Sequence, residues 1–279
     1  MTPDGVHPRV TRLPILLTTL LAAAVLPAGI LAAASRAPAT EVKITRASIA
    51  LIIDDLGNQY DLDSEAIRLP GPVACAFLPY APFTRVLAEQ AHAGRKEVLL
   101  HLPMQALNEE PREAGELTLD MTQRQFEDTL QADLAAVPHA SGINNHKGSL
   151  LTRHPGHMAW LMQVMRREGS LFFVDSRTTT ATVARRLAGE FQVPSIDRKV
   201  FLDNEQNTRA IQAQFRRLVD IARREGLALG IGHPHAETLA VLRQELARLD
   251  DYTIQLVPVS RLIEIEHRRK GVWQASLSR

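Results

Sequence analysis

The chain has 279 residues, of which 45% are hydrophobic and 23% are charged, and its formal net charge is +1. These fractions are ordinary for a folded globular protein and exclude a disordered or fibrous chain. The balanced charge argues against a nucleic-acid-binding protein, which normally carries a basic excess or a basic stripe. The single cysteine, Cys75, excludes an intrachain disulfide framework and a cysteine-based zinc site.

The first 34 residues have the features of an export signal. Residues 13–34 contain no charge, Arg9 and Arg12 precede them, and a small-residue Ala-Ala-Ala-Ser segment ends the stretch. A positive start, an apolar centre and a small-residue end predict a Sec-type signal peptide. About 20 apolar residues also span a bilayer, so an uncleaved inner-membrane anchor is an alternative, as is a buried core helix. Export predicts a periplasmic or other extracytoplasmic location. Without this segment the chain is formally neutral.

Residues 35–47 are predicted to be a linker, because small and polar residues there cannot bury enough apolar surface to fold. From Ser48 onward, short apolar runs alternate with amphipathic segments. The apolar runs predict strands over 48–53, 73–77, 97–102, 141–144, 170–174, 191–195, 227–231 and 253–257. The amphipathic segments predict helices over 82–94, 122–137, 156–169, 181–189, 208–226 and 235–249.

Strands that are apolar on both faces and separated by helices predict parallel pairing. Six to eight such units favour an α/β fold, either a (β/α) barrel or a large doubly wound sheet. No composition break marks a second domain, so one domain is expected over 48–265, followed by a tail over 266–279.

Titratable and polar residues collect directly after several predicted strands, where sites form in parallel α/β folds. One carboxylate and two neutral imidazoles can hold a divalent metal with open positions. A second carboxylate can take a proton from water, and a further histidine can protonate a leaving nitrogen, so the set suits metal-assisted amide hydrolysis. The residues at these strand ends are Asp54, Asp55, His101, Asn144, Asn145, His146, Lys147, Ser149, Asp175, Arg177 and His233.

Each of these residues also has an ordinary structural interpretation. The Asp54–Asp55 pair and Asp175 are typical of helix caps, and His101 is compatible with a buried core histidine. His146 and His233 are compatible with solvated loops. The segment Asp203-Asn204 is interpreted as a cap or turn rather than as part of a site.

Five segments, in the order IALIIDDLGN, EVLLHLPMQ, INNHKGS, FFVDSRTT and GIGHPHAETL, resemble the divergent polysaccharide deacetylase family, a branch of the carbohydrate esterases. The resemblance runs from about residue 48 to residue 262 and implies a distorted (β/α) barrel of seven or eight parallel strands that binds one divalent metal, commonly zinc. It implies that Asp54 is the general base and that Asp55 and His101 bind the metal. The main family has a second histidine where this chain has Gln105, and we infer that His146 replaces it.

The resemblance also implies the remaining catalytic roles. His233 corresponds to the histidine that protonates the leaving group, and Asp175 to the acid that orients that histidine. The arginine-containing third motif of the main family is not evident in this sequence. Around these groups, the side chains expected to line the substrate or support the metal ligands are Asn144, Asn145, Lys147, Ser149 and Arg177.

The sequence therefore predicts an exported, metal-dependent hydrolase that removes acetyl groups from an acetylated envelope polysaccharide, and no nucleic-acid partner. A different class stays open, namely a non-catalytic glycan-binding or division-associated envelope factor on the same fold. A metal-dependent phosphoesterase is a third candidate, against which the lack of a glycine-rich phosphate loop argues. The metal content of the protein and the release of acetate would separate these alternatives.

Overall fold

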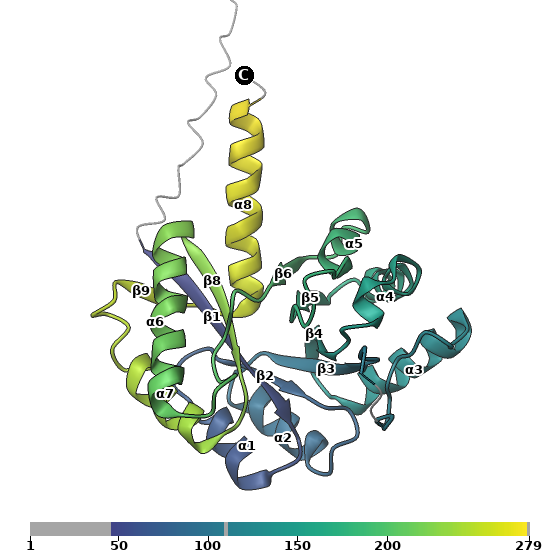
Figure 1. The fold of residues 1–279 in the computed structure, drawn as a ribbon, viewed down its shortest axis with the longest axis horizontal. Helices are drawn as coiled ribbons and strands as arrows, with labels where there is room; N and C mark the ends of the chain where they lie inside the picture. Colours follow the sequence, from purple (N-terminus) through teal and green to yellow (C-terminus); the bar gives the residue numbers. More distant parts are fainter. Residues whose placement is uncertain (1–45, 109–110, 278–279) are drawn as a thin grey trace, which may run out of the picture. The chain divides into compact units, whose positions relative to one another are not determined.

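A computed structural model describes residues 46–108 and 111–277, which form a curled parallel sheet with surrounding helices (Figure 1). The predicted signal or anchor, and the linker as far as residue 45, lie outside the described residues. Within the described ranges, no helix combines the length and hydrophobicity that crossing a bilayer requires. The strands are β1 (Ala47–Leu56), β2 (Ala74–Phe77), β3 (Val98–Met104), β4 (Ala140–Lys147), β5 (Phe172–Asp175), β6 (Ser195–Asp197), β7 (Val200–Phe201), β8 (Leu227–Gly232) and β9 (Ile254–Leu256).

Helices follow most of the strands, as expected for parallel pairing. They are α1 (Tyr60–Ile67), α2 (Thr84–Ala93), α3 (Gln123–Ala136), α4 (Pro155–Glu168), α5 (Ala184–Glu190), α6 (Thr208–Glu225), α7 (Ala236–Leu246) and α8 (Val259–Leu277), with a short 3₁₀ turn η1 (Leu151–Arg153). Helix α3 begins at a reciprocal capping box that Thr122 and Gln125 form.

The sheet runs in the order β6-β5-β4-β3-β2-β1-β8-β7, every pair is parallel, and β9 pairs with the start of β1. Strands β6 and β7 lie at opposite ends of this order, yet only Arg198 and Lys199 separate them in the chain. The Arg198 amide donates to the Asp175 carbonyl, and the Lys199 amide donates to the Leu229 carbonyl. The chain itself thus bridges the two sheet edges. This arrangement confirms a single-domain distorted (β/α) barrel.

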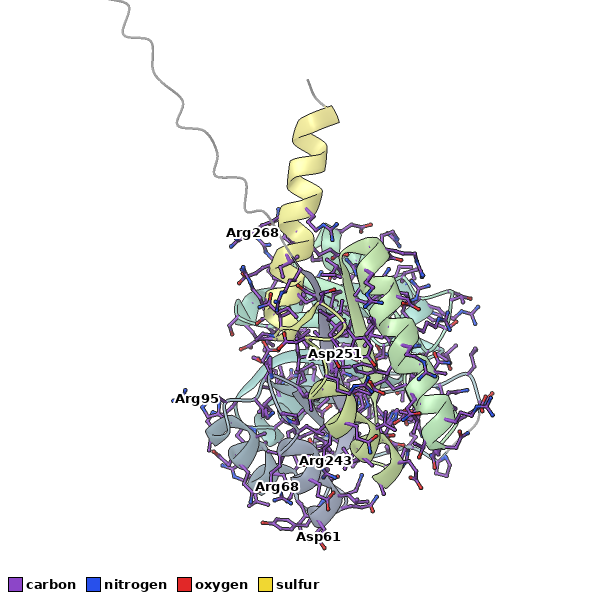
Figure 2. All side chains as sticks on the ribbon, turned by 90° about the vertical axis from the view of Figure 1, so that its left-hand side faces the viewer. Asp61, Arg68, Arg95, Arg243, Asp251 and Arg268 are labelled. Atoms are coloured by element: carbon purple, nitrogen blue, oxygen red, sulfur yellow. The ribbon has the colours of Figure 1, made fainter. Side chains whose placement is uncertain are left out.

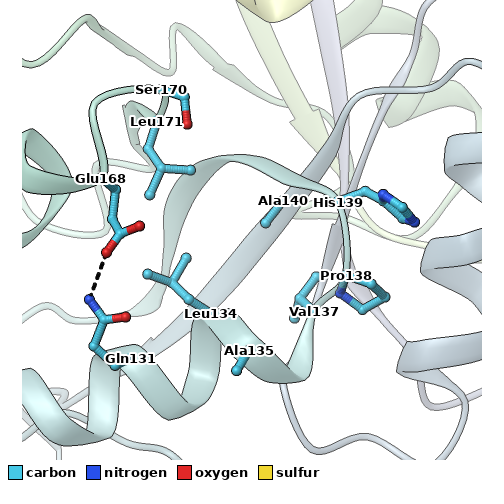
Figure 3. Close-up of a pocket in the computed structure, with 10 residues that line it drawn as sticks. All are labelled: Gln131, Leu134, Ala135, Val137, Pro138, His139, Ala140, Glu168, Ser170 and Leu171. Atoms are coloured by element: carbon cyan, nitrogen blue, oxygen red, sulfur yellow. Dashed lines mark hydrogen bonds between the residues drawn. The ribbon is translucent and has the colours of Figure 1, made fainter.

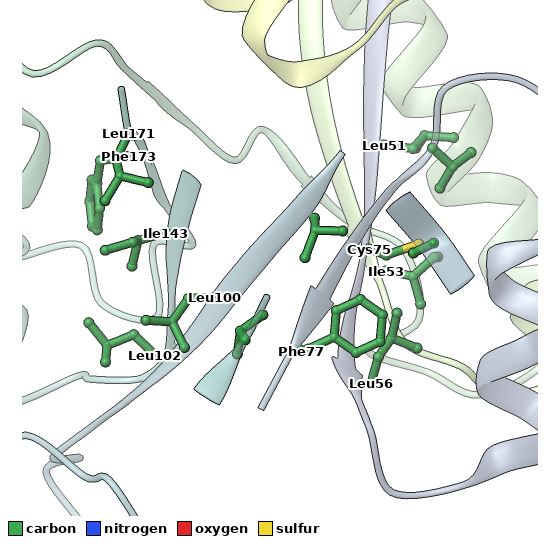
Figure 4. Close-up of a cluster of buried hydrophobic side chains, with 14 of the residues drawn as sticks. Leu51, Ile53, Leu56, Cys75, Phe77, Leu100, Leu102, Ile143, Leu171 and Phe173 are labelled. Atoms are coloured by element: carbon green, nitrogen blue, oxygen red, sulfur yellow. The ribbon is translucent and has the colours of Figure 1, made fainter. Parts of the chain in front are cut away.

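The two faces of the sheet bury two separate hydrophobic clusters. Along β1, Ile49, Leu51 and Ile53 join the cluster that includes residues of α1 to α7, which Figure 4 shows in part. The alternate residues Ala50 and Ile52 join a smaller cluster inside the barrel, which α8 completes with Val259, Leu262, Ile263 and Ile265. Because side chains alternate along a strand, each strand has an inner and an outer series, and the inner series leads to the barrel mouth.

Charged side chains of the helices and loops lie on the outside of this structure. Figure 2 shows Asp61, Arg68, Arg95, Arg243 and Asp251 at the periphery, and all five are exposed. Titratable groups that are buried inside the barrel mouth are therefore exceptional, because a buried charge is costly unless it has a partner.

Several elements differ from the sequence-based expectation. Helix α1 was not predicted, because eight residues are too few to show an apolar stripe. Of the predicted strand 191–195, only Ser195 is in β6. The preceding Gln192 has a left-handed backbone conformation, with φ of 59°, that no strand accommodates. Helix α8 continues through the predicted tail to Leu277.

Candidate metal and catalytic centre

The inner series of neighbouring strands places predicted site residues together at the barrel mouth. Asp54 continues the inner series of β1, His101 belongs to that of β3, and Asn144 to that of β4. All three are buried, with relative exposures of 3%, 2% and 0%. His233 follows the inner series of β8 in the same way. The strands that carry Asp54, His101 and His233 are far apart in sequence but adjacent or nearly adjacent in the sheet.

Asp55, His101 and His146 bring three ligand atoms to one point, as the sequence predicted. The Asp55 Oδ1 atom lies 3.1 Å from His101 Nε2 and 2.9 Å from His146 Nδ1. The two imidazole nitrogens are themselves 3.1 Å apart. These three atoms form a nearly equilateral triangle at the barrel mouth.

Asp55 reaches this triangle because the backbone departs from strand geometry at its position. Its φ is 59°, which is the left-handed region that side-chain-bearing residues seldom adopt and that Asp and Asn tolerate best. The register between β1 and β2 also shifts between Ile53 and Leu56. The turn rotates the carboxylate of Asp55 toward the two histidines, whereas regular alternation would point it to the opposite face.

The triangle fits a divalent cation by its geometry and by the chemistry of its donors. Nitrogen and oxygen ligands lie about 2.0–2.2 Å from zinc, so donors at near-right angles are roughly 3 Å apart. Oδ1 of Asp55 is buried, and the two histidine nitrogens at 3.1 and 2.9 Å are its neighbours in the triangle. One carboxylate and two imidazoles on one side of an ion leave positions for water and substrate, which is the ligand set of a catalytic site rather than of a closed structural site.

The electrostatics of the centre favour a positive charge at this point. Burial alone would lower the pKa of His101, but the carboxylates of Asp54 and Asp55 raise it to about 9. Burial alone would raise the pKa of Asp55, but hydrogen bonding and charge interactions with His101 and His146 hold that pKa far below its usual range. A cation between these groups would be stabilised by the same carboxylates that favour the protonated form of His101.

Asp54 lies beside the triangle and is held by Asn144. The Asn144 amide donates from Nδ2 to Asp54 Oδ1 at 2.8 Å, and its Oδ1 lies 3.0 Å from His101 Nδ1. One amide thereby orients both the predicted base and a predicted ligand. Burial raises the pKa of Asp54 although His101 and His233 oppose that effect. A raised pKa suits a carboxylate that accepts a proton near neutral pH.

His233 is oriented by Asp203, and the prediction that Asp175 does so is wrong. Asp203 Oδ1 lies 3.0 Å from His233 Nδ1, and Asp203 Oδ2 accepts hydrogen bonds from the His233 amide at 2.6 Å and from the Thr238 hydroxyl at 2.8 Å. This pairing directs His233 Nε2 toward the centre, 3.8 Å from Asp55 Oδ2. Burial alone would lower the pKa of His233, but Asp203 and Asp54 raise it.

The alternation along β5 explains why Asp175 is not the partner. Phe172 and Val174 belong to the inner series, so Asp175 is in phase with Phe173 of the outer cluster. Its carboxylate accepts hydrogen bonds from the Arg177 amide at 2.8 Å and from the Thr182 hydroxyl at 2.9 Å. Asp175 therefore stabilises the turn after β5. Val200 and Leu202 belong to the outer cluster, so Asp203, which the sequence suggested to be a cap or turn, is in the opposite, inner phase.

The remaining predicted residues organise the loops around the centre, and their contact with substrate stays a prediction. Asn145 accepts from the Ser176 amide and donates to the Lys147 carbonyl, both at 2.8 Å. Ser149 accepts from the Leu107 amide at 2.9 Å. The Arg177 guanidinium is 3.6 Å from Asp197 Oδ2 and its side chain is 43% exposed.

Gln105, which occupies the place of the main family's second histidine, has a structural role. Its side-chain carbonyl accepts a hydrogen bond from the Leu119 amide at 2.9 Å, and its backbone amide donates to the Leu117 carbonyl at 2.9 Å. Gln105 thus fixes the loop between β3 and α3. Glu113 of that loop lies 3.2 Å from His146 Nε2 and 2.7 Å from Lys147 Nζ, and no sequence pattern singled it out.

A second group of possible ligands, Asp203, His233 and His235, fits a metal less well. Both oxygens of Asp203 already accept hydrogen bonds from His233 and Thr238. His235 Nε2 lies 3.0 Å from the side-chain nitrogen of Gln206. We therefore assign this group to the orientation of His233.

A hollow of about 420 Å³ lies at the opposite end of the sheet, before β4 and β5 (Figure 3). Its lining includes Leu134, Val137, His139 and Leu171, and a hydrogen bond of 3.0 Å joins Gln131 to Glu168 at its edge. Catalytic groups of parallel barrels come from the carboxyl ends of the strands, so this hollow is not assigned to the centre.

Comparison with known proteins connects this centre to a family. The family profile described as divergent polysaccharide deacetylase matches residues 51–263. The uncharacterized protein YibQ of Escherichia coli K12 is 40% identical over 215 residues, which cover 77% of this chain and 67% of YibQ.

Three solved structures share the fold at lower identity. An uncharacterized protein from Agrobacterium tumefaciens C58 matches with a TM-score of 0.74 and 22% identity, over 78% of this chain and 89% of that one. A mutant of the peptidoglycan deacetylase PdaC from Bacillus subtilis matches with a TM-score of 0.50 and 12% identity, over 85% and 99%. A mutant of a CE4 family pseudoenzyme from Bacillus anthracis, with restored enzymatic activity, matches with a TM-score of 0.50 and 13% identity, over 78% and 68%.

These structural similarities establish the fold. The profile match covers most of the chain and includes the strand ends that carry Asp54, Asp55, His101, His146 and His233. The chain belongs to the divergent polysaccharide deacetylase family.

Proposed function

We propose that the protein is an exported, metal-dependent deacetylase that removes acetyl groups from an envelope polysaccharide. The observation that carries this proposal is the triangle of Asp55 Oδ1, His101 Nε2 and His146 Nδ1, with sides of 2.9–3.1 Å, beside Asp54 and His233. When bound there, a divalent ion such as zinc would polarise the acetyl carbonyl and lower the pKa of a water molecule.

Asp54 is the proposed general base. Its Oδ2 atom is 3.6 Å from His101 Nε2, so the carboxylate borders the open side of the ligand triangle. Its Oδ1 atom is occupied by the hydrogen bond from Asn144, which leaves Oδ2 to accept the proton of the attacking water. The oxygen of that water forms a bond to the acetyl carbon, and the water proton passes to Asp54.

His233 is the proposed general acid. Asp203 accepts a hydrogen bond from His233 Nδ1 and stabilises the imidazolium, so Nε2 carries the proton that faces the centre. When the bond between the acetyl carbon and the sugar nitrogen or oxygen breaks, that proton passes to the departing atom. The products are acetate and a free amino or hydroxyl group on the glycan.

Exposed apolar side chains around the barrel mouth support a large substrate. The exposed large hydrophobic residues of the described chain all follow the carboxyl ends of β1, β2 or β3, and the rings of Tyr60 and Phe83 contact edge to face at 5.6 Å. Apolar surface of this kind binds the apolar faces of sugar rings or another partner. The residues are Tyr60, Tyr80, Phe83, Val86 and Leu107.

Export is the part of the proposal that depends on the N-terminal sequence alone. The uncharged stretch 13–34 after Arg9 and Arg12 supports either a cleaved signal peptide or a retained anchor, and both place the catalytic domain outside the cytoplasm. Fractionation of cells that produce the full chain would test this point, and recovery in the cytoplasm would contradict it.

The activity is tested by measuring metal content and acetate release with the same preparation. Protein purified without chelator is analysed for metal and incubated with N- and O-acetylated envelope glycans and acetylated chitooligosaccharides. We expect about one divalent ion per chain and acetate release that stops on chelation. Metal-loaded protein that releases no acetate but binds a glycan would favour the non-catalytic alternative.

A further inference from the structure

His146 uses its two ring nitrogens in opposite directions. Its Nδ1 atom points to Asp55 and His101, whereas its Nε2 atom lies 3.2 Å from Oε2 of Glu113. A histidine binds a metal through an unprotonated nitrogen, so ligation through Nδ1 requires that the proton reside on Nε2. A carboxylate at Nε2 favours that tautomer and fixes the plane of the ring.

Glu113 is held in place independently of His146. Its second oxygen, Oε1, lies 2.7 Å from Lys147 Nζ. The loop that carries Glu113 is tied to β3 by the hydrogen bond from the Leu117 amide to the Pro103 carbonyl, at 2.9 Å. The bond from the Leu119 amide to the Gln105 side chain anchors the same stretch. The carboxylate is thus presented by an anchored segment.

The other histidine of the triangle has a partner of a different kind. His101 points Nε2 at the triangle, and its Nδ1 lies 3.0 Å from the neutral amide oxygen of Asn144. Both histidines therefore have an acceptor on the nitrogen that faces away from the triangle. Such partners orient a ligand and raise its basicity, and their removal typically weakens metal binding about 10- to 100-fold.

We propose that Glu113 is a positioning residue of the metal centre: it accepts a hydrogen bond from Nε2–H of His146 and thereby holds Nδ1 toward the ion. This inference rests on the proposed metal centre but not on the reaction. The loop between β3 and α3 would then help to position a ligand, although the ligands themselves all come from β1, β3 and β4. Lys147 would also have a role, because its ammonium group orients the Glu113 carboxylate.

The test is the zinc affinity of the full-length protein, measured by competition with a chromophoric chelator. We expect the dissociation constant to rise about 10- to 100-fold in Glu113→Ala. In Glu113→Gln the side-chain carbonyl still accepts from Nε2, so the expected rise is smaller than in Glu113→Ala. The visible absorption of the cobalt-substituted protein should change in Glu113→Ala, because the geometry at the ion changes.

Glu89→Gln is the matched control, since Glu89 pairs with His139 at 2.8 Å on the exposed surface. It removes the same charge from a carboxylate–histidine pair outside the centre, and we expect affinity within twofold of the wild type. Circular dichroism of the metal-free variants checks folding, and the near-isosteric Glu113→Gln guards against misfolding of Glu113→Ala. Zinc affinity of folded Glu113→Ala within twofold of the wild type, or a wild type without a zinc site, would overturn the inference. Absent acetate release with this affinity pattern intact would refute only the deacetylase proposal.

Discussion

Two clusters of histidine and carboxylate lie at opposite ends of the sheet and differ in how they are built. At the amino end, before β4, His139 contacts Glu89 at 2.8 Å and stacks on His92 with ring centroids 3.8 Å apart. At the carboxyl end, His101, His146 and Asp55 converge within 2.9–3.1 Å of one another. The His139 and Glu89 side chains are 36% and 52% exposed, whereas the His101 and His146 side chains are 3% and 15% exposed and that of Asp55 is 35% exposed.

The difference shows that residue type alone does not make a site. The amino-end pair lies in water, which screens its charges, and such pairs contribute little to stability or binding. The carboxyl-end groups lie in the barrel mouth, where each buried charge requires a compensating partner. The two histidine rings are also oriented by a second contact, His101 by Asn144 and His146 by Glu113. Substitutions at the carboxyl end should therefore lower metal affinity and acetate release, whereas substitutions at the amino end should change them little.

The largest effect is expected from Asp55→Asn. The substitution removes the charged ligand, and asparagine tolerates the left-handed backbone at this position, where φ is 59°. We expect metal affinity to fall at least about 100-fold and acetate release at least about 1,000-fold, with an unchanged circular dichroism spectrum. Folded Asp55→Asn protein that retains stoichiometric metal with wild-type affinity would refute the ligand assignment.

Asp203→Asn should lower activity without removing the metal. Asp203 raises the pKa of His233, so its loss leaves less imidazolium available as the acid. We expect kcat to fall about 10- to 1,000-fold and the alkaline limb of the pH–rate profile to move to lower pH.

The matched variant for Asp203→Asn is Asp175→Asn, because Asp175 contacts Thr182 and the turn after β5. Its pH profile should keep the wild-type shape. An alkaline limb that moves in Asp175→Asn and stays in Asp203→Asn would reverse the assignment of the orienting acid.

Asp133→Asn tests how a buried carboxyl group outside the centre makes stability depend on pH. Asp133 is fully buried on α3, and burial raises its pKa to about 7, although an interaction with the Tyr80 hydroxyl opposes this effect. Folding therefore favours the protonated form, and the stability that this form provides is lost as the pH rises from about 4 to about 7. Asparagine carries no charge at either pH.

Urea unfolding at pH 5 and pH 8 measures this effect. Between these values the wild type should lose about 2–3 kcal/mol relative to Asp133→Asn. Equal changes in the two proteins would show that Asp133 is not protonated in the folded state at pH 5.

The smallest effect is expected from His139→Ala at the amino-end cluster. The ring is exposed and its ion pair with Glu89 is screened by solvent. We expect zinc affinity and acetate release within twofold of the wild type, and stability within about 0.5 kcal/mol. A loss of metal binding in His139→Ala would remove the distinction between the two clusters.

Apolar strands and the polar residues after them are local patterns, and they were sufficient to predict a parallel α/β fold with polar residues at the carboxyl ends of its strands. The choice of a barrel, and of Asp55, His101 and His146 as the ligand set, depended on the family resemblance. The error at Asp175 was one of phase. Phe172 and Val174 face the interior, so Asp175 faces the helices, and counting along the strand would have indicated this. Asp203 was interpreted as part of a cap or turn because β7 has only two residues, Val200 and Phe201, which are too few to show alternation.

Two other features have no sequence signal that we recognise. The left-handed conformation of Asp55 turns its carboxylate toward the histidines, against the alternation of β1. Glu113 lies in a loop without periodicity, and its contact with His146 depends on how Gln105 folds that loop back on β3. Both depend on tertiary contacts that only the folded chain brings together.

The most direct test of the centre is anomalous X-ray scattering at the zinc absorption edge from crystals of the zinc-loaded protein. We expect one strong peak within about 2.0–2.2 Å of Asp55 Oδ1, His101 Nε2 and His146 Nδ1. A peak between Asp203, His233 and His235 instead, or no peak at either group, would contradict the assignment of the metal centre.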